Sequence, residues 1–525
     1  MSNNMLVEIS GVPLTRIGDI VKLRANGSPD QVALVESSGS WTCRELASAI
    51  RDTEIWLTGS GVRPGDRVMI VCENCRAFVA ILMAVTNVDA WPVLVNARLS
   101  ANEVDKIRDH CGARLAIYAV GASPHAADHT KHRRASIREL SDAGPIAVGN
   151  LDESVEPEAV EPNPKERVAA LIYTSGSTGM PKGVMLSHKN LLFMASVSSK
   201  IRKLAPKDRL YGILPMSHAV GLSVVLLGGL LSGATVCLSS RFDPMTARRT
   251  IETERLTVVL GVPAMFAQML EYAKLRGVKR FDLPELRIIS SSGAPLHPAT
   301  KIATEELFGL VLHNGYGMTE CSPTIAQADP EEPRSDSSVG RILPGVEVKF
   351  VGPDGKKVGA SDVGELRVRG PNVMKGYYRA SEETAAAIDN DGWFNTRDLA
   401  RLEDGYLFIV GRTKELIVHR GFNVYPAEVE AAISSHPAVA RCAVIGWRRN
   451  GDEDVIAVVQ VVAGAKLGAA ELAEHAAGLL APYKRPAEIH IVDRMPLTPT
   501  GKIAKSELAK QFADPMSGAA QTALS

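Results

Sequence analysis

The chain has 525 residues, of which 45% are hydrophobic and 22% charged, and its Lys plus Arg equal its Asp plus Glu at 59 each. This length exceeds what one hydrophobic core usually serves, so we expect two or more domains. A formal net charge of zero without a basic block excludes the electrostatic footprint of a nucleic-acid-binding or anionic-membrane protein, and seven cysteines form no disulfide framework in so long a chain.

The first 165 residues alternate helix-like and strand-like patterns. Residues 46–61 and 75–90 have the apolar spacing of helices, and residues 67–72 form a short apolar run typical of a buried strand. This alternation predicts a doubly wound α/β layer. Residues 1–21 lack the basic and apolar segments of a secretory signal, so we expect the protein in the cytoplasm.

A second α/β region follows a linker rich in Pro and Glu, residues 152–166. It opens with the apolar run 168–173, which is typical of a fully buried parallel strand, and continues in the same style to residue 320. Residues 219–238 carry no charge and are long enough to span a membrane. Glycines interrupt them, however, and their end reads as a buried strand after a helix, so we predict no membrane span.

The sequence changes in character after about residue 338. Residues 345–370 contain short β-branched runs broken by Asp-Gly and Gly turns, which predicts antiparallel strands or a small barrel. Past residue 411, residues 425–436 read as a short helix, and two apolar runs flank an Asn-Gly turn like the strands of a hairpin. A further helix and strand complete an α+β tail that is large enough to form its own domain.

Residues 173–183, Tyr-Thr-Ser-Gly-Ser-Thr-Gly-Met-Pro-Lys-Gly, form the strongest local signal. A buried strand leads into this segment, and a helix beginning near Ser187 leads out of it. Glycines let the backbone approach an anion, hydroxyls and amides donate to phosphate oxygens, and Lys182 adds a positive charge. The segment is not a Walker loop, and alone it is more often a flexible turn. Its interpretation therefore depends on the rest of the chain.

Five further motifs accompany this loop in a fixed order. The six motifs are TSGSTGMPKG (174–183), PMSH (215–218), YGMTE (316–320), TRDLA (396–400), GRTKELI (411–417) and PLTPTGK (496–502). With them, the sequence resembles the adenylate-forming (AMP-binding) superfamily of acyl-CoA synthetases, luciferases and peptide-synthetase adenylation domains, in its acyl-CoA synthetase and 4-coumarate:CoA ligase-like branch. The resemblance covers essentially the whole chain.

The resemblance implies a fold and a function. The expected fold is a large N-terminal domain, residues 1–411, made of two doubly wound α/β subdomains and a small β-barrel-like subdomain. A small mobile α+β domain, residues 412–525, is expected to carry the catalytic lysine. The implied function is that of an AMP-forming carboxylic acid:CoA ligase, which uses ATP, Mg²⁺ and CoA. Two alternatives are an adenylating enzyme that loads a carrier protein's phosphopantetheine and a nucleotide-binding protein without catalytic activity. A homodimer is compatible with this function.

The reaction that the resemblance implies begins with attack of a carboxylate on the α-phosphorus of ATP. Two anions must meet, so charge neutralisation and positioning are expected to dominate. The resemblance makes Glu320 the Mg²⁺ ligand, places Thr319 at the α-phosphate and makes Lys502 the catalytic lysine. It assigns the nucleotide to a larger set, with Tyr316 against adenine and Asp398 and Arg412 at the ribose. That set is Thr174, Ser175, Gly176, Ser177, Thr178, Gly179, Lys182, Asn314, Gly315, Tyr316, Asp398 and Arg412.

The resemblance implies that the second half-reaction is thiol attack on the acyl carbonyl, after rotation of the small domain about a hinge. The resemblance places this hinge at Lys414 and CoA contacts at Gly421 and Phe422. Two positions depart from the family's pattern. Arg397 precedes Asp398 where glycine is usual, and Val418 replaces a lysine that follows the hinge.

The acyl pocket is expected after PMSH, at residues 290–296 and at residues 313–324. These segments supply small or uncharged residues, including Gly315, and no group that would pair a second charge on the substrate. This excludes amino acids and dicarboxylates and leaves fatty, aryl and arylalkenoic acids. The pocket residues so assigned are His218, Val220, Gly221, Ser292, Gly293 and Ser322.

Two other groups of residues suggest chemistry only weakly. Cys72 and Cys75 have thioredoxin-like spacing, but other thioredoxin features are lacking, so we expect no redox role. His125, His129 and His132 would share one face of a helix. They lie in a polar, alanine-rich stretch without Cys or carboxylate partners, which favours a solvated face over a metal site.

Overall fold

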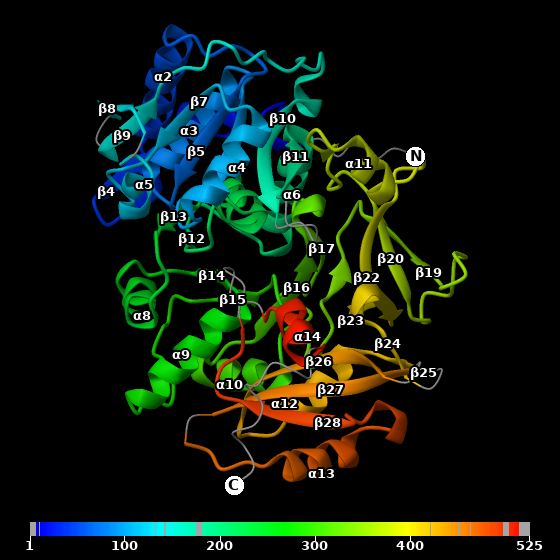
Figure 1. Cartoon of the computed structure of the whole chain (residues 1–525). Coiled ribbons are helices and arrows are strands. Elements are labelled where there is room, and N and C mark those ends of the chain that lie inside the picture. Colours follow the sequence, from blue (N-terminus) through cyan, green and yellow to red (C-terminus); the bar gives the residue numbers. More distant parts are fainter. Residues whose placement is uncertain are drawn as a thin grey trace.

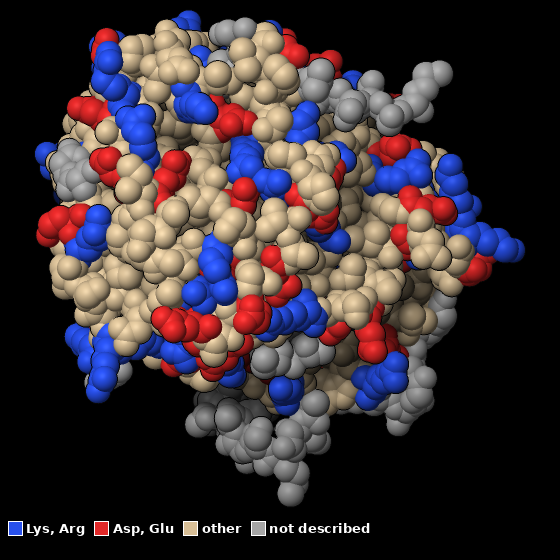
Figure 2. Space-filling model, turned by 90° about the horizontal axis from the view of Figure 1, so that it is seen from above, with Lys and Arg blue, Asp and Glu red and all other residues tan. Residues whose placement is uncertain are grey.

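The computed structural model describes residues 7–9, 11–131, 133–140, 143–174, 181–419, 422–449, 452–462, 464–496 and 503–513. Two large sheets and their helices make up most of the molecule, and the C-terminal segment forms a smaller body beside them (Figure 1). On the face seen in Figure 2, acidic and basic side chains are interspersed, in keeping with the net charge of zero.

The first large sheet has eight strands, and its central strands run parallel. Their order is β21 (Gly376–Tyr377), β11 (Lys182–Ser187), β10 (Val168–Thr174), β6 (Trp91–Asn96), β5 (Arg67–Cys72), β7 (Leu115–Tyr118), β9 (Pro145–Gly149) and β8 (Ala135–Glu139). Its helices are α2 (Cys43–Gly59), α3 (Arg76–Asn87), α4 (Ala101–Cys111) and α5 (Pro124–Asp128). The predicted α/β alternation is therefore confirmed in this region.

The second large sheet has thirteen strands: those at one end pair antiparallel, the following strands pair in parallel, and an antiparallel hairpin forms the other edge. Their order is β19 (Glu347–Val351), β20 (Gly364–Arg369), β22 (Phe394–Glu403), β23 (Tyr406–Arg412), β18 (Arg341–Ile342), β17 (Thr324–Gln327), β16 (Leu312–Gly317), β15 (Ile288–Ser291), β14 (Val258–Gly261), β12 (Arg209–Gly212), β13 (Thr235–Leu238), β3 (Val32–Glu36) and β4 (Gly39–Thr42). The antiparallel strands predicted after residue 338 are present, and they continue this sheet outward from β16.

One strand pair departs from the expected order along the chain. The hairpin β3–β4 lies near the N-terminus but joins the second sheet, where Leu34 pairs in parallel with Val236 of β13. Local patterns predict a strand, but they do not specify which sheet it joins, because that choice depends on partners far away in the sequence.

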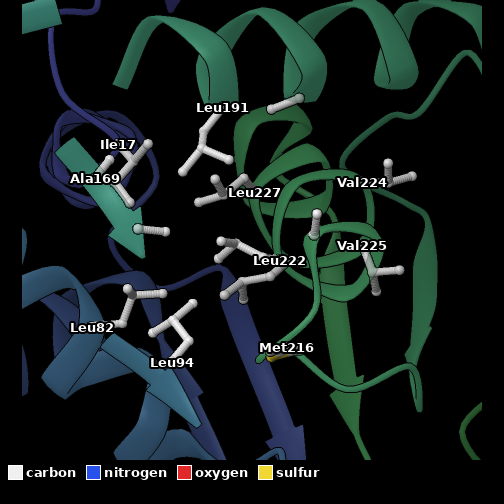
Figure 3. Close-up of a cluster of buried hydrophobic side chains, with 14 of the residues drawn as sticks. Ile17, Leu82, Leu94, Ala169, Leu191, Met216, Leu222, Val224, Val225 and Leu227 are labelled. Carbon is white, nitrogen blue, oxygen red and sulfur yellow. The ribbon is translucent and has the colours of Figure 1, made fainter. Parts of the chain in front are cut away.

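The largest buried cluster lies between the two large sheets. Figure 3 shows Leu222 and Leu227 pointing toward Leu82 of α3 and Leu94 of β6, with Leu191 of α6 nearby. All five are buried. Because a fully buried leucine contributes about 1.5–3 kcal/mol, this apolar layer ties the two sheets together.

The uncharged segment 219–238 belongs to this core. It forms a π-helical stretch η3 (Val220–Leu227), helix α7 (Gly228–Ser232) and strand β13, as the helix-then-strand reading predicts. Among the described residues, no helix is long and apolar enough to cross a bilayer. The remaining helices of this region are α1 (Gly18–Gly27), α6 (His188–Ile201), α8 (Pro244–Thr253), α9 (Pro263–Leu275), α10 (Pro298–Phe308) and α11 (Ser381–Ala387).

The C-terminal segment has its own sheet and its own buried clusters. β26 (Val439–Arg449) and β27 (Asp452–Val461) form the predicted antiparallel hairpin, and β28 (Glu488–Val492) pairs in parallel with β27. The turn residues Asn450 and Gly451 lie outside the described residues. The other elements here are β24 (Ile417–His419), β25 (Phe422–Val424), α12 (Pro426–Ser434), α13 (Ala469–Leu479) and α14 (Lys505–Ala513), and β1 (Glu8–Ile9) and β2 (Val12–Pro13) pair near the N-terminus.

Candidate active site

The segment predicted to bind phosphate connects two antiparallel strands. β10 ends at Thr174, β11 begins at Lys182, and these two residues face each other across the pair. Helix α6 then starts at His188 with Ser187 as its cap, as predicted. Lys182 is thus fixed by strand pairing at the mouth of this loop. The predicted contacts Ser175, Gly176, Ser177, Thr178 and Gly179 lie outside the described residues.

Glu320 and Lys182 meet at a tyrosine. Tyr377 of β21 pairs with β11, and its hydroxyl donates to Oε1 of Glu320 at 2.9 Å. The ammonium of Lys182 lies 5.1 Å from the centre of the Tyr377 ring, over its face. Burial, with the negative charge of Glu320, raises the pKa of Tyr377, so its hydroxyl stays protonated and donating.

This arrangement fits a hard divalent cation. Mg²⁺ prefers oxygen ligands such as a carboxylate. The Tyr377 hydroxyl bonds to Oε1 of Glu320, and this bond leaves Oε2 available as a ligand. Thr319 lies beside Glu320 in the short turn η4 (Thr319–Cys321). Sequence reasoning missed Tyr377. Its segment Gly-Tyr-Tyr was visible, but its pairing with β11 joins residues nearly two hundred positions apart.

Asp398 of β22, Tyr316 of β16 and Arg412 of β23 form a second cluster. The Tyr316 hydroxyl donates to Oδ2 of Asp398 at 2.5 Å, and Nε of Arg412 lies 3.2 Å from Oδ1. Burial raises the pKa of Asp398, and the two hydrogen bonds oppose this rise. The centre of this cluster is the carboxylate of Asp398, which is buried. An ionised carboxylate only accepts hydrogen bonds, so it suits a ligand that presents hydroxyl donors.

The remaining predicted nucleotide contacts lie on β16. Asn314 donates from its amide to the Ser338 carbonyl at 3.3 Å and accepts from the Gly315 N–H. Gly317 cannot carry a side chain, because an added Cβ would lie 1.8 Å from the Pro323 carbonyl oxygen. Tyr316, between these glycines, is thus held on a strand that packs closely against the following turn.

Arg397 adopts the conformation that glycine would take. Its φ is 59°, in the left-handed region, and its N–H donates to Oδ1 of Asn395 at 2.9 Å. Its carbonyl accepts a hydrogen bond from Thr413 at 3.2 Å. A non-glycine residue pays a conformational cost there, but the loop keeps the course that places Asp398 opposite Arg412.

Side-chain hydrogen bonds from Asn74 fix the PMSH segment, residues 215–218, and the strand end before it. Its amide donates to the carbonyls of Gly212 and Leu214, each at 2.9 Å, and its Oδ1 accepts from the Met216 N–H at 2.8 Å. Asn74 is buried. Sequence reasoning considered only the cysteines around Asn74 and missed this role, for which the sequence carries no local signal.

The predicted acyl-pocket residues lie on several elements. His218 and Val220 are half-buried at the start of η3, and an added Cβ on Gly221 would lie 2.3 Å from the Pro215 carbonyl oxygen. Ser322 is buried, its Oγ has no hydrogen-bond partner, and its carbonyl accepts from Ser223 of η3 at 2.8 Å. Ser292 is half-buried just after β15. Gly293 is exposed, with φ of 83°.

The segment around residue 414 is tied to the last helix. Lys505 of α14 forms ion pairs with Glu415 at 2.6 Å and with Glu430 at 2.8 Å. Burial alone would lower the pKa of Lys505, but the two carboxylates raise it. Lys414 is exposed in the short turn η5 (Thr413–Glu415). Lys502, three residues before Lys505, lies outside the described residues.

The predicted CoA contacts lie in the hairpin β24–β25. Phe422 is exposed, and its ring stacks on Tyr483 with the ring centres 4.7 Å apart. Gly421 lies outside the described residues. Val418 is exposed, and its N–H donates to Glu453 at 2.9 Å.

One of the weaker sequence expectations is wrong. His129 is buried, and its ring nitrogen bonds to the Ala97 carbonyl at 2.9 Å, so it does not lie on a solvated face. The helix there ends at Asp128, which lets the chain turn His129 inward. His125 is exposed, and His132 lies outside the described residues. Across the part of the chain that the structure describes, no three His, Cys, Asp or Glu side chains gather as metal ligands.

Comparisons with known proteins agree with the family that the sequence motifs indicate. The sequence model of a family described as AMP-binding enzyme matches residues 21–378, and that of the AMP-binding enzyme C-terminal domain matches residues 428–502. The chain is 35% identical to a feruloyl-CoA synthase of an Amycolatopsis species over 93% of this chain and 97% of the relative. It is 32% identical to a 4-coumarate–CoA ligase of Pinus taeda over 89% of each chain.

Solved structures of similar shape cover nearly the whole chain. ATP-bound MatB of Rhodopseudomonas palustris superposes with a TM-score of 0.82 at 28% identity, over 95% of this chain and 99% of that one. The o-succinylbenzoate CoA synthetase of Bacillus subtilis, in complex with an acyl-adenylate intermediate, superposes with a TM-score of 0.79 at 29% identity. That match covers 94% of this chain and 98% of the other.

Proposed function

Because this chain belongs to the family of AMP-binding enzymes, we propose that it makes the CoA thioester of an arylalkenoic acid by way of the acyl-adenylate. The chain is an AMP-forming carboxylic acid:CoA ligase that uses ATP, Mg²⁺ and CoA. One observation carries the choice of acid: relatives that match almost the whole chain at 35% and 32% identity are named for feruloyl and coumaroyl substrates. The uncharged residues of the expected acyl pocket agree with such an acid, because they offer a second carboxylate no partner.

In the first step, a carboxylate oxygen attacks the α-phosphorus and pyrophosphate leaves. We assign Lys182 and the loop after Thr174 to the phosphates, where their charge and donors offset the repulsion between the two anions. Glu320, held by Tyr377, would hold Mg²⁺, which neutralises phosphate charge when bound. Lys502 would bridge the acid and the α-phosphate as negative charge builds.

The adenosine would be held by the second cluster. Asp398 is an acceptor with two oxygens, and the ribose presents two hydroxyl donors to it. Arg412 pairs with Asp398 at 3.2 Å and would reach the same sugar. We assign the adenine to the surface of Tyr316, flanked by Asn314 and Gly315 on the same strand, because the Tyr316 hydroxyl bonds to Asp398.

In the second step, the thiol attacks the acyl carbonyl and AMP leaves. We propose that residues 1–411 and 412–525 are separate domains that rotate about Lys414 between the two steps. Three observations support this division. The large sheet ends at Arg412, the C-terminal segment has its own buried clusters, and the two family models match on either side of this point. Gly421 and Phe422 would then contact CoA.

We assign the thiol to CoA and not to a carrier protein, because the relatives that match over most of their length are named as CoA ligases or synthases. Two further proposals concern the protein's surroundings. The seven cysteines are free and buried, which supports the reducing cytoplasm as its location. We also propose a homodimer, and light scattering at two protein concentrations tests it.

The test of this function is AMP release from ATP and Mg²⁺ with CoA across fatty, benzoic and cinnamic acids. We expect CoA-dependent AMP release with cinnamic acids at a higher kcat/KM than with the other classes. Highest turnover with a fatty acid would overturn the choice of acid. Acid-dependent pyrophosphate release without CoA consumption, coupled to loading of a phosphopantetheine carrier, would overturn the choice of thiol.

A further inference from the structure

His110 joins two tyrosines at the edge of the first sheet. It lies in the last turn of α4, which packs beside β10 and β11 (Figure 1). Its Nδ1 lies 2.7 Å from the hydroxyl of Tyr173 on β10, within hydrogen-bond distance, and the two rings meet edge to face. The ring of Tyr378, directly after β21, also meets His110 edge to face, with the ring centres 6.1 Å apart. This one side chain therefore contacts residues of the two strands on either side of β11.

Both tyrosines contact Gly183, the residue after Lys182 on β11. Tyr173 faces Gly183 across the strand pair, and an added Cβ on Gly183 would lie 3.1 Å from the Tyr173 ring. The N–H of Tyr378 donates to the Gly183 carbonyl at 2.7 Å. Displacement of either tyrosine would therefore move the backbone that holds Lys182, because interiors packed this closely transmit small shifts.

The opposite face of these strands carries the groups that we assign to Mg²⁺ and the phosphates. Tyr378 is 4% exposed and packs with side chains of α4. Its neighbour Tyr377 packs against the separate cluster between the two large sheets, as expected for side chains that alternate along a strand. Tyr377 in turn bonds to Glu320, and Lys182 lies over its ring. His110 therefore lies on the back of this candidate site.

Tyr173 depends on His110 more than Tyr378 does. The Tyr378 hydroxyl donates to the carboxylate of Glu158. Among the residues that the structure describes, the Tyr173 hydroxyl bonds to His110 alone. Burial and the charge of Arg379 lower the pKa of His110 below its usual value, so its imidazole is neutral near pH 7. The role of this ring is thus to hold Tyr173 without adding a charge.

We propose that His110 is a positioning residue for ATP and Mg²⁺, which acts through Tyr173 and Tyr378. These two tyrosines fix the backbone that presents Lys182 and Tyr377 to the phosphates and to the Mg²⁺ ligand. This inference rests on the proposed function, because it takes that face of the strands as the nucleotide site.

The binding of the acid should not depend on His110. The PMSH segment at the expected acyl pocket is fixed by Asn74, which lies just before α3 and bonds to the Met216 N–H. Loss of the contacts of His110 should therefore weaken the binding of ATP and leave the KM for the acid within about twofold. A merely structural role would raise both constants together.

The test measures the Kd of the full-length enzyme for ATP with Mg²⁺ by isothermal titration calorimetry, without the acid, and the KM for the acid by AMP release. We expect His110→Ala to raise the Kd for ATP by about five- to tenfold, as for one lost hydrogen bond. Asp109→Ala is the matched control, because this neighbouring side chain is exposed and pairs with Arg108 at the surface, and it should keep the Kd within about twofold.

Two further variants separate the hydrogen bond from the packing. His110→Asn keeps a neutral polar group near the position of Nδ1, so it should recover most of the affinity for ATP. Tyr173→Phe removes the same hydrogen bond from its other end. The effects of His110→Ala and Tyr173→Phe should therefore not add, and the double variant should match His110→Ala within about twofold.

An unchanged Kd for ATP in folded His110→Ala would overturn the positioning role and leave the proposed function intact. Equal rises in the Kd for ATP and the KM for the acid, or additive effects in the double variant, would also overturn it. If His110→Ala fails to fold, Tyr173→Phe decides, since an unchanged Kd there would refute the role of the hydrogen bond. A wild-type enzyme that binds no ATP would overturn the proposed function itself.

Discussion

Substitution of Asn74 tests most directly how the expected acyl pocket is positioned, because Asn74 fixes the PMSH segment but is not part of it. Asn74→Ala removes two donors and one acceptor and leaves the Gly212 and Leu214 carbonyls and the Met216 N–H without this partner. The Gly212 carbonyl still accepts from the Ser239 N–H at 3.0 Å, so two groups lose their side-chain partner without a replacement. Each buried polar group left unpaired costs about 1–3 kcal/mol, so we expect a loss of about 3 kcal/mol in stability.

Asn74→Ala should also lower activity, because the PMSH segment positions residues of the expected acyl pocket. His218 is the last residue of this segment and η3 follows it, and displacement of a positioned group by about 1 Å can cost about a hundredfold in rate. We expect Asn74→Ala to lower kcat/KM for the acid by about ten- to a hundredfold. The KM for ATP should stay within about twofold, because Asp398 and Lys182 are held by other strands.

The assay is AMP release with the acid and ATP varied in turn, together with urea unfolding. Asn163→Ala is the matched control. Asn163 is exposed and caps a short turn by accepting from the Lys165 N–H, so this change should cost about 1 kcal/mol or less and leave kinetics unchanged. Unchanged kcat/KM for the acid in a folded Asn74→Ala variant would refute the reasoning.

Three further predictions concern single side chains. Arg397→Gly should raise the free energy of unfolding by about 1 kcal/mol, since glycine adopts a φ of 59° without strain, and a urea midpoint that stays or falls would contradict this. Tyr377→Phe should weaken the apparent affinity for Mg²⁺ by about ten- to a hundredfold, because Glu320 loses the donor that orients it; titration of AMP release with Mg²⁺ checks this, and an unchanged midpoint would count against it. Burial lowers the pKa of His188 from 6.5 to about 3, and its Nδ1 accepts from the Ile17 N–H. As the pH falls, the unfolded chain binds a proton at this histidine before the folded chain does. The contribution of the neutral ring to the free energy of unfolding is therefore complete above about pH 6.5, and between pH 6.5 and 3 it decreases by up to about 1.4 kcal/mol per pH unit. His188→Asn should flatten this fall in urea unfolding at a series of pH values, and an equally steep fall would speak against it.

Short-range features of the fold were predictable. Ser187 caps α6 where the hydroxyl precedes an apolar run, and Pro426 opens α12 at its first turn, because both signals act within a few residues. The hairpin of β26 and β27 was predictable for the same reason. The placement of β3 in the second sheet was not, because its parallel partner β13 lies about two hundred residues away.

The site was predictable where chemistry concentrates in a motif. Tyr316, Asp398 and Arg412 come together as expected, although they lie on three strands. Asn74 and Tyr377 were not predictable, because each acts through a contact that only the folded chain creates. The sequence raised Arg397 as a departure from the family's pattern, and its left-handed backbone accounts for how the loop tolerates it.

The central claim is that this site forms an acyl-adenylate before any thiol takes part. Exchange of labelled pyrophosphate into ATP measures that step directly, with an arylalkenoic acid present and CoA absent. The account predicts exchange that requires the acid and falls about a hundredfold or more in Lys502→Ala, because a group that offsets charge in the transition state is lost. Exchange that does not require the acid, or that survives unchanged in Lys502→Ala, would contradict it.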